Sequence, residues 1–254
     1  CADANGDGYL SGVSNGKQIW KEISEGNIRA ASFGLNDRWV PLYNIHKIYA
    51  GLRDAYLITG SKDAKNMFIG LTEWMYNLTS GLTYEQMQDM LRSEHGGLNE
   101  VFADAAAISG DRRYLELAKK FSHTAVLEPL LRGEDKLTGM HANTQIPKVI
   151  GYKRIADIEG NKEWDKAADF FWKTVVENRS ITIGGNSVRE HFHPADDFSS
   201  MLESEQGPET CNTYNMLRLT KMLFETSGDS HYMDYYERAL YNHILSTVNP
   251  IQGG

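Results

Sequence analysis

The sequence has little of three things, and each shortage argues against a class of protein. Only two cysteines are present, Cys1 and Cys211, so no framework of disulfides can hold the fold. No apolar run approaches the roughly 20 residues that a membrane-spanning helix needs, and the sequence predicts no membrane partner. Basic residues are outnumbered, at 26 against 34 acidic ones, for a net charge of −8. This charge disfavours nucleic acid as a partner, because binding it needs clustered Lys and Arg.

Strand patterns are also scarce. No window alternates between apolar and polar residues with a period of two for long enough to predict a sheet, and residues 180–183 could form a short strand at most. The composition is otherwise that of an ordinary globular protein, with 41% hydrophobic and 24% charged residues. The sequence therefore favours an all-α fold.

What is present is a helical repeat. Four times, a helical pattern ends at a glycine followed by Ser, Asp or Asn; these glycines are Gly60, Gly110, Gly160 and Gly228. A glycine just past a helix supplies the left-handed conformation that ends it, and the polar residue can cap the next helix. Each junction thus predicts the turn of a helical hairpin. Spacings of 50, 50 and 68 residues indicate stacked hairpins.

The two helices of a hairpin differ in their apolar faces. The second helices are one-sided, as Trp164, Phe171 and Val175 show, whereas residues 103–108 make a first helix nearly apolar all round. Apolar inner helices and one-sided outer helices are what a two-layered ring requires. The sequence predicts an α/α toroid, or part of one, as a single domain over residues 1–254.

Polar residues gather where the first helices begin. The clusters contain His46; His95, Asn99 and Glu100; His141, Asn143 and Gln145; and Glu209 and Cys211. In a ring these helix ends would converge on one mouth, lined by groups suited to recognising hydroxyls. The alternative is that the clusters are helix caps, because Asn, Thr and Glu are enriched there. Histidine is not a favoured cap and recurs in three clusters, which favours the pocket.

The last repeat is 18 residues longer than the others, and the surplus lies in a loop at Arg189–Gly207. Glu190 stands in this loop beside Arg189 and Phe192. Apolar surroundings would raise the pKa of its carboxyl and make it an acid, whereas a neighbouring Arg would keep it ionised, and both readings stay open. A plain surface carboxylate is the alternative.

Glu209 and Cys211 could both reach one metal ion, and zinc accepts carboxylate and thiolate. Zinc in proteins usually has about four ligands, so His191 or His193 could add a third. A buried structural cysteine is the alternative reading of Cys211.

A weaker calcium pattern lies near the start, where Asp3, Asn5, Asp7 and Gly8 occupy the first positions of a calcium loop. Ser14 stands where that loop needs an acidic residue, which argues against calcium. The chain opens abruptly at Cys1 and stops at Gly254, so we expect a fragment, and its compartment stays open between periplasm, cell exterior and cytoplasm.

At these residues the chain resembles the catalytic domain of glycoside hydrolase family 127 and the related family 146, the β-L-arabinofuranosidases. The matching segments are residues 39–47, 94–100, 141–148, 185–192 and 207–212. The resemblance implies an (α/α)6 barrel followed by β-sandwich domains, which these residues do not include, and a bacterial protein acting on plant-derived glycans. It also implies that Glu190 is the general acid/base and that Glu209 and Cys211 bind zinc. Sugar-contacting positions would be His46, His95, Asn99, Glu100, His141, Asn143, Gln145 and His191.

The family's nucleophile is one of an adjacent pair of cysteines that completes the zinc site, and no such pair occurs here. We therefore expect this sequence alone to be inactive. In the implied mechanism a thiolate attacks the anomeric carbon while Glu190 protonates the leaving oxygen and later activates water, which retains configuration. Two alternatives stay open. One is a glycosidase or lyase on the same ring that uses only carboxylates, and the other is a sugar-binding scaffold without turnover.

Overall fold

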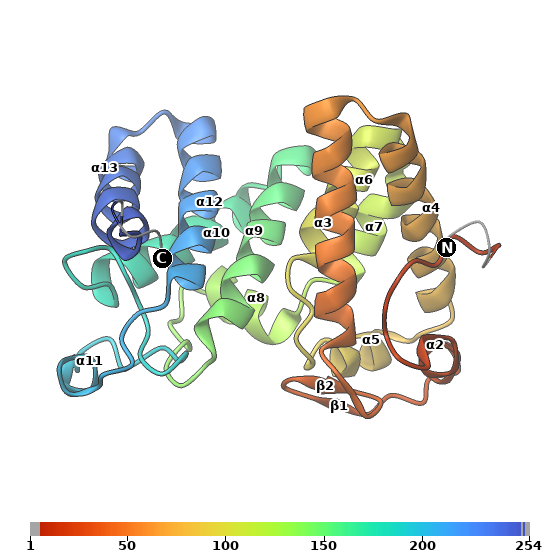
Figure 1. Ribbon diagram of the computed structural model, residues 1–254, viewed down its shortest axis with the longest axis horizontal. Helices are drawn as coiled ribbons and strands as arrows, with labels where there is room; N and C mark the ends of the chain where they lie inside the picture. The colour runs from red at the N-terminus through yellow and green to blue at the C-terminus, as the bar shows by residue number, and fades with distance from the viewer. Residues whose placement is uncertain (1–5, 250, 252–254) are drawn as a thin grey trace. The chain divides into compact units, whose positions relative to one another are not determined.

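The computed structural model describes residues 6–249 and 251, and these form two compact units, Cys1–Thr124 and Ala125–Gly254. Each unit is built mainly from helices (Figure 1). No described helix is long and apolar enough to cross a membrane. The elements of the first unit are α2 (Gly16–Ser24), β1 (Ala30–Ala31), β2 (Gly34–Leu35), β3 (Arg38–Trp39), α3 (Pro41–Thr59), α4 (Lys62–Thr79), α5 (Tyr84–Met90), α6 (Leu98–Ser109) and α7 (Arg112–Lys120).

The second unit continues the helical pattern. Its elements are α8 (Thr124–Leu131), which starts at the boundary, α9 (Ala142–Glu159), α10 (Lys162–Asn178), α11 (Ser199–Glu203), α12 (Thr210–Ser227), α13 (Ser230–Ala239), and two short non-α helices, η1 (Leu240–Ile244) and η2 (Leu245–Thr247). The sequence analysis foresaw neither α5 nor α8, which lie between the hairpins.

The four predicted hairpins are confirmed. Helix α3 packs on α4, α6 on α7, α9 on α10 and α12 on α13, and each pair lies side by side in Figure 1. The turn glycines have φ between 69° and 78°, as a left-handed helix end requires. The side chains of the next residues, Ser61, Asp111, Asn161 and Asp229, all accept a backbone N–H and cap the second helix.

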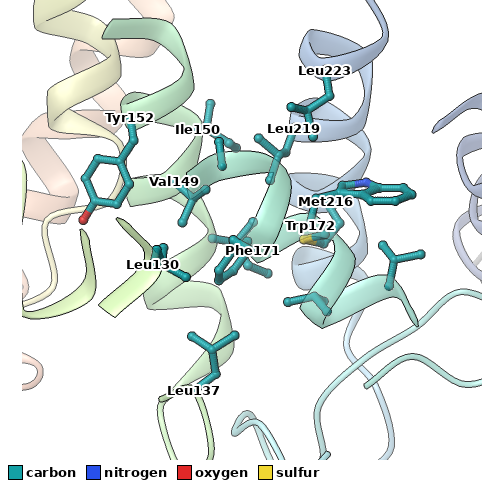
Figure 2. Packing of buried hydrophobic residues seen from close by; sticks show 14 of the residues in the cluster. Leu130, Leu137, Val149, Ile150, Tyr152, Phe171, Trp172, Met216, Leu219 and Leu223 are labelled. Atoms are coloured by element: carbon teal, nitrogen blue, oxygen red, sulfur yellow. The ribbon is translucent and has the colours of Figure 1, made fainter. Parts of the chain in front are cut away.

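Burial follows the predicted division between first and second helices most clearly in α9 and α10. Every residue of α9 from Thr144 to Lys153 is buried, whereas α10 buries the face that carries Phe171, Trp172 and Val175. In the second unit these faces form one core with side chains of α8 and α12, which Figure 2 shows around Val149, Phe171, Trp172 and Met216. The indole N–H of Trp172 is satisfied inside this core by Thr220 Oγ1 at 2.8 Å. The core gives the polar segments around α9 and α12 a rigid support.

A small antiparallel sheet, β1-β2-β3, is the one regular feature of the described residues that the sequence analysis excluded. Its strands have two residues each, too short to show alternation. The turn between β2 and β3 places Asn36 and Asp37 at φ 46° and 61°, the backbone of a tight two-residue hairpin. At residues 180–183, where a strand was conceivable, only an isolated bridge between Ser180 and Asn186 is present.

Candidate active site

The loop that carries Glu190 is fastened beside the start of α9. Backbone hydrogen bonds run from Gly139 to the Phe192 carbonyl at 2.8 Å, from Phe192 to the Met140 carbonyl at 2.9 Å and from Ala142 to the Glu190 carbonyl at 2.8 Å. Phe192 is buried in the core of the second unit, where its ring meets Phe171 edge to face. A residue 48 positions beyond Ala142 is thus held at the N-terminus of the same helix.

Glu190 stands on a strained turn. Val188 and His191 exchange backbone hydrogen bonds of 2.9 and 3.0 Å, and the two residues between them, Arg189 and Glu190, have φ of 47° and 69°. Left-handed backbone is uncommon outside glycine and costs roughly 1–3 kcal/mol per residue, and such strain gathers at functional sites. The Glu190 side chain is 57% exposed. The turn therefore presents this carboxylate to solvent, where a substrate can reach it.

His141 faces Glu190 across the start of α9. Its Nδ1 accepts the Thr144 backbone N–H at 3.2 Å and lies 2.8 Å from the Thr144 hydroxyl, so the imidazole is the N-cap of α9. Because Nδ1 accepts, the ring proton lies on Nε2, which is 3.8 Å from Glu190 Oε2. The sequence analysis treated histidine as an unfavoured cap, and for His141 that reading is wrong.

The charge state of His141 follows from its surroundings. Burial lowers the pKa of His141 below its ordinary value, although the Glu190 carboxylate, and more weakly that of Glu209, oppose the shift. The helix N-terminus that it caps also disfavours a positive charge. His141 is thus a neutral N–H donor directed at Glu190, and it also lies within the electrostatic reach of Glu209.

Glu209 and Cys211 begin α12 and lie on the same side. Cys211 Sγ is 3.6 Å from Glu209 Oε2. Burial, and after it the Glu209 carboxylate, raises the pKa of the Cys211 thiol to about 11. A divalent cation bound between the Cys211 thiol and the Glu209 carboxylate would offset both the burial and the negative charge that raise the pKa of the thiol. The pair therefore fits zinc as two of its roughly four ligands.

Of the two further zinc ligands that the sequence offered, His193 is engaged at both ring nitrogens and His191 at Nδ1 only. Both ring nitrogens of His193 contact backbone carbonyls, among them those of Pro194 and Arg179, and Nδ1 of His191 contacts the Arg189 carbonyl at 2.7 Å. Within residues 6–249 and 251, no three or more His, Cys, Asp or Glu side chains form a metal-binding group. His193 fixes the loop instead of offering a ligand.

Hydrogen bonds join α9, the loop and α12 into one framework. Asn212 Nδ2 donates to Ser187 Oγ at 2.6 Å, and Asn215 Nδ2 donates to Asn143 Oδ1 at 2.8 Å. Gln145 donates to the His141 carbonyl and accepts from the buried Lys148. The predicted sugar-contacting residues Asn143 and Gln145 therefore also hold the framework together.

The sequence analysis missed several residues that build this framework. Ser187 carries no chemical signal, and Lys148 lies inside a helical pattern. Arg179 is buried and binds the His193 carbonyl, Asp135 and Thr138, which ties the loop to the segment before α9. Charged residues in an otherwise buried stretch were the signal that could have found Lys148.

The other predicted residues form a cluster in the first unit. The buried His46 ring packs against Gly96 and Gly97. The packing is so close that a Cβ added at Gly96 would lie 2.3 Å from His46 Nδ1. Glu100 is buried beside Gly97 and pairs with Arg53 at 3.0 Å.

The remaining members of this cluster are held close to α6. Asn99 Oδ1 accepts the Glu100 backbone N–H, and the His95 ring contacts the Ser93 carbonyl at 3.0 Å. In the calcium pattern, Asp3 and Asn5 lie outside the described residues, and Asp7 accepts the Tyr9 N–H at 3.0 Å. The weak calcium pattern is therefore not tested by the described residues.

With this geometry in place, comparison with known proteins identifies the family. All of residues 1–254 match the family described as β-L-arabinofuranosidase, GH127 catalytic domain. The chain belongs to this family. No curated protein matches the chain in sequence.

Solved structures show the same fold. A GH127 β-arabinofuranosidase is 22% identical with a TM-score of 0.65 over 82% of this chain and 34% of its own. A GH127 β-L-arabinofuranosidase from Geobacillus stearothermophilus T6 is 17% identical with a TM-score of 0.68, over 96% of this chain and 41% of its own.

A more distant likeness is to an inactive variant of a GH76 α-1,6-mannanase from a Salegentibacter species. It is 14% identical with a TM-score of 0.55, over 89% of this chain and 69% of its own. These likenesses confirm the all-α, six-hairpin fold class. The chain spans well under half the length of the two GH127 structures.

Proposed function

We propose that this GH127 protein is a retaining glycoside hydrolase that releases β-L-arabinofuranose from plant-derived glycans, with Glu190 as general acid/base. Membership of the family supports the reaction class. The observation that carries the role of Glu190 is its exposed carboxylate, held on a strained turn 3.8 Å from His141 Nε2. A general acid has to reach the leaving oxygen and return to the same place as a base, which a fixed turn allows.

The proton movements can be assigned to atoms of this chain. Glu190 in its acid form would give its proton to the glycosidic oxygen as the cysteine thiolate that the family resemblance implies, which these residues do not include, bonds to the anomeric carbon and displaces that oxygen. The resulting carboxylate then takes a proton from the water that releases the sugar. The His141 Nε2–H points towards this carboxylate and would steady its orientation between the two steps.

Glu209 and Cys211 would hold a zinc ion. When bound, zinc would supply a positive charge that keeps its cysteine ligands, among them the implied nucleophile that this sequence does not contain, in the thiolate form. The 3.6 Å approach of the Cys211 sulfur to Glu209 Oε2 supports this assignment.

The test uses the full-length protein and 4-nitrophenyl β-L-arabinofuranoside, with proton NMR to read the configuration of the sugar first released. Retained configuration is expected. With a poor alkyl leaving group, Glu190→Gln should lower kcat about a hundredfold or more, and with 4-nitrophenol, which leaves without an acid, the effect on the first step should be smaller. Glu205→Gln, which changes an exposed carboxylate of the same loop, is the matched control.

Three results would contradict the proposal. An unchanged rate for Glu190→Gln on the alkyl glycoside would remove Glu190 from the role. Full activity of Cys211→Ala, with no zinc in the protein, would favour a glycosidase that uses carboxylates alone. Sugar binding without any turnover would favour a non-catalytic scaffold.

A further inference from the structure

A second place in the molecule has the features of a sugar site. The small sheet of the first unit borders a hollow of about 640 Å³ lined by residues 31–34 and 37–39. Trp39 is 74% exposed there, and its ring lies 5.7 Å from the ring of Phe33 with 31° between their planes. Two such rings form an aromatic shelf, the name used below for Phe33 and Trp39. A tryptophan side chain combines a large apolar ring with a polar N–H, so an exposed aromatic pair of this kind suits a ligand that is partly apolar and partly polar.

The shelf is built rigidly. Val40 donates its N–H to the Phe33 carbonyl at 3.0 Å, which closes the sheet behind the two rings. Val40 itself has φ 38°, a left-handed backbone that is an outlier for a β-branched residue. Asn36 is buried beneath the turn, where its amide donates to Glu22 and to the Asn27 carbonyl. The side chain of Trp39 is thus presented by a backbone that the surroundings hold in place.

The charges around the shelf are balanced within the protein. Arg29 pairs with Glu22 at 3.2 Å and with Asp37 at 3.0 Å. Arg38 donates to the carbonyls of Ser14 and Asp37. The hollow therefore offers no concentrated charge of either sign, which argues against a phosphate, a carboxylate or a cation as its ligand. An aromatic floor with polar groups at its rim suits a neutral ring that carries hydroxyls.

The shelf is continuous with the polar cluster of the first unit. The Ser32 carbonyl accepts the Glu94 N–H at 2.9 Å, directly before His95 and Gly96. At the other end of the sheet, Trp39 and Val40 lead into α3, which carries His46 against Gly96. A ligand on the shelf would therefore border the segments predicted to contact sugar in this unit.

From these observations we propose that Phe33 and Trp39 stack one sugar ring of a neutral glycan. The choice of a glycan rests on the proposed function. We therefore expect Trp39 to contribute to glycan affinity through its ring face, not through its bulk.

The test measures binding, so that it does not depend on turnover. Isothermal titration calorimetry is carried out on full-length Glu190→Gln protein with a tetrasaccharide that ends in β-L-arabinofuranose. Trp39→Leu, which keeps apolar bulk without a ring face, should raise Kd about tenfold, the size of one aromatic contact. Trp39→Phe should stay within about threefold of the parent. Tyr241→Ala changes another exposed aromatic, in the second unit, and should have no effect.

The outcomes separate this proposal from the first one. Equal affinities of the parent and Trp39→Leu would overturn the shelf, as would a parent that does not bind the tetrasaccharide. An equal loss in Trp39→Leu and Trp39→Phe would also overturn it, since stacking would then not be the cause. Absence of hydrolysis by the native protein would instead contradict the glycosidase proposal. The calorimetry would still test whether the shelf binds a sugar ring.

Discussion

Around Arg53, in the first unit, charged side chains are buried and pair with one another. Around Glu190, in the second unit, the carboxylate is more than half exposed and is held on a strained turn. Arg53 lies 3.0 Å from Glu100 and 2.8 Å from Asp104, with all three side chains at most 12% exposed. Glu190 instead faces a neutral imidazole at 3.8 Å.

The difference separates two uses of a polar cluster. A buried network fixes geometry, because each charge in it depends on its partners. A carboxylate that donates and recovers a proton must stay open to substrate and cannot be locked to an arginine. Both clusters lie next to the start of a first helix, and only their surroundings tell them apart. The predictions below test this division.

Removal of Arg53 should have the largest effect. Arg53→Met takes the guanidinium away from Glu100 and Asp104, and breaking a buried ion pair in this way costs about 3–5 kcal/mol. Urea unfolding followed by far-ultraviolet circular dichroism measures the loss. Arg92→Met is the control, because Arg92 pairs with Asp89 on the surface and its loss should cost less than about 1 kcal/mol. Similar losses in the two variants would refute the claim that the first cluster is structural.

Glu190→Gly should separate activity from stability. Glycine adopts the left-handed backbone of this position without strain, so the free energy of unfolding should rise by about 1 kcal/mol. Activity on an alkyl arabinofuranoside should fall about a hundredfold or more, because the acid is gone. The readouts are the urea midpoint and kcat. A destabilised glycine variant would show that the turn is not strained in solution.

The helical hairpins could be predicted from the sequence because each turn is marked by a few neighbouring residues. Gly60, Gly110, Gly160 and Gly228 each combine a left-handed helix end with a following cap, and all four were found. The sheet that carries Trp39 was missed because two-residue strands leave no periodicity. Its stability comes from Asn36 and from contacts across the chain, which the sequence analysis could not register.

The site was less readable. The surplus length of the last repeat and its ionisable residues drew attention to Glu190, Glu209 and Cys211. The cap formed by His141 was not predicted, because histidine seldom caps helices. Only the structure shows that its Nδ1 accepts the Thr144 N–H. The contribution of Ser187 was also invisible, since its partner Asn212 lies 25 residues away.

Replacement of His141 should distinguish its two roles. Asparagine is a preferred N-cap, so His141→Asn keeps the cap of α9 but removes the Nε2–H that faces Glu190. Stability should be unchanged, and kcat should fall about tenfold, or about 1.4 kcal/mol, because the imidazole no longer interacts with the carboxylate. His141→Ala should lose the same activity and also about 1 kcal/mol of stability. Equal kcat in the native protein and the asparagine variant would remove His141 from the positioning role.

The smallest effect concerns pH. Burial lowers the pKa of both His141 and His243, although a hydrogen bond with the Pro208 backbone opposes the shift in His243. The pKa of histidine in an unfolded chain is about 6.5. Between that pH and the lower pKa of the folded state, the unfolded chain binds more protons than the folded one. Stability should therefore be complete above about pH 6.5 and fall as the solution is acidified below it. Urea midpoints measured across this range should show a shallower fall in the double variant His141→Asn with His243→Gln. An unaltered fall would mean that groups other than these two histidines control the acid response.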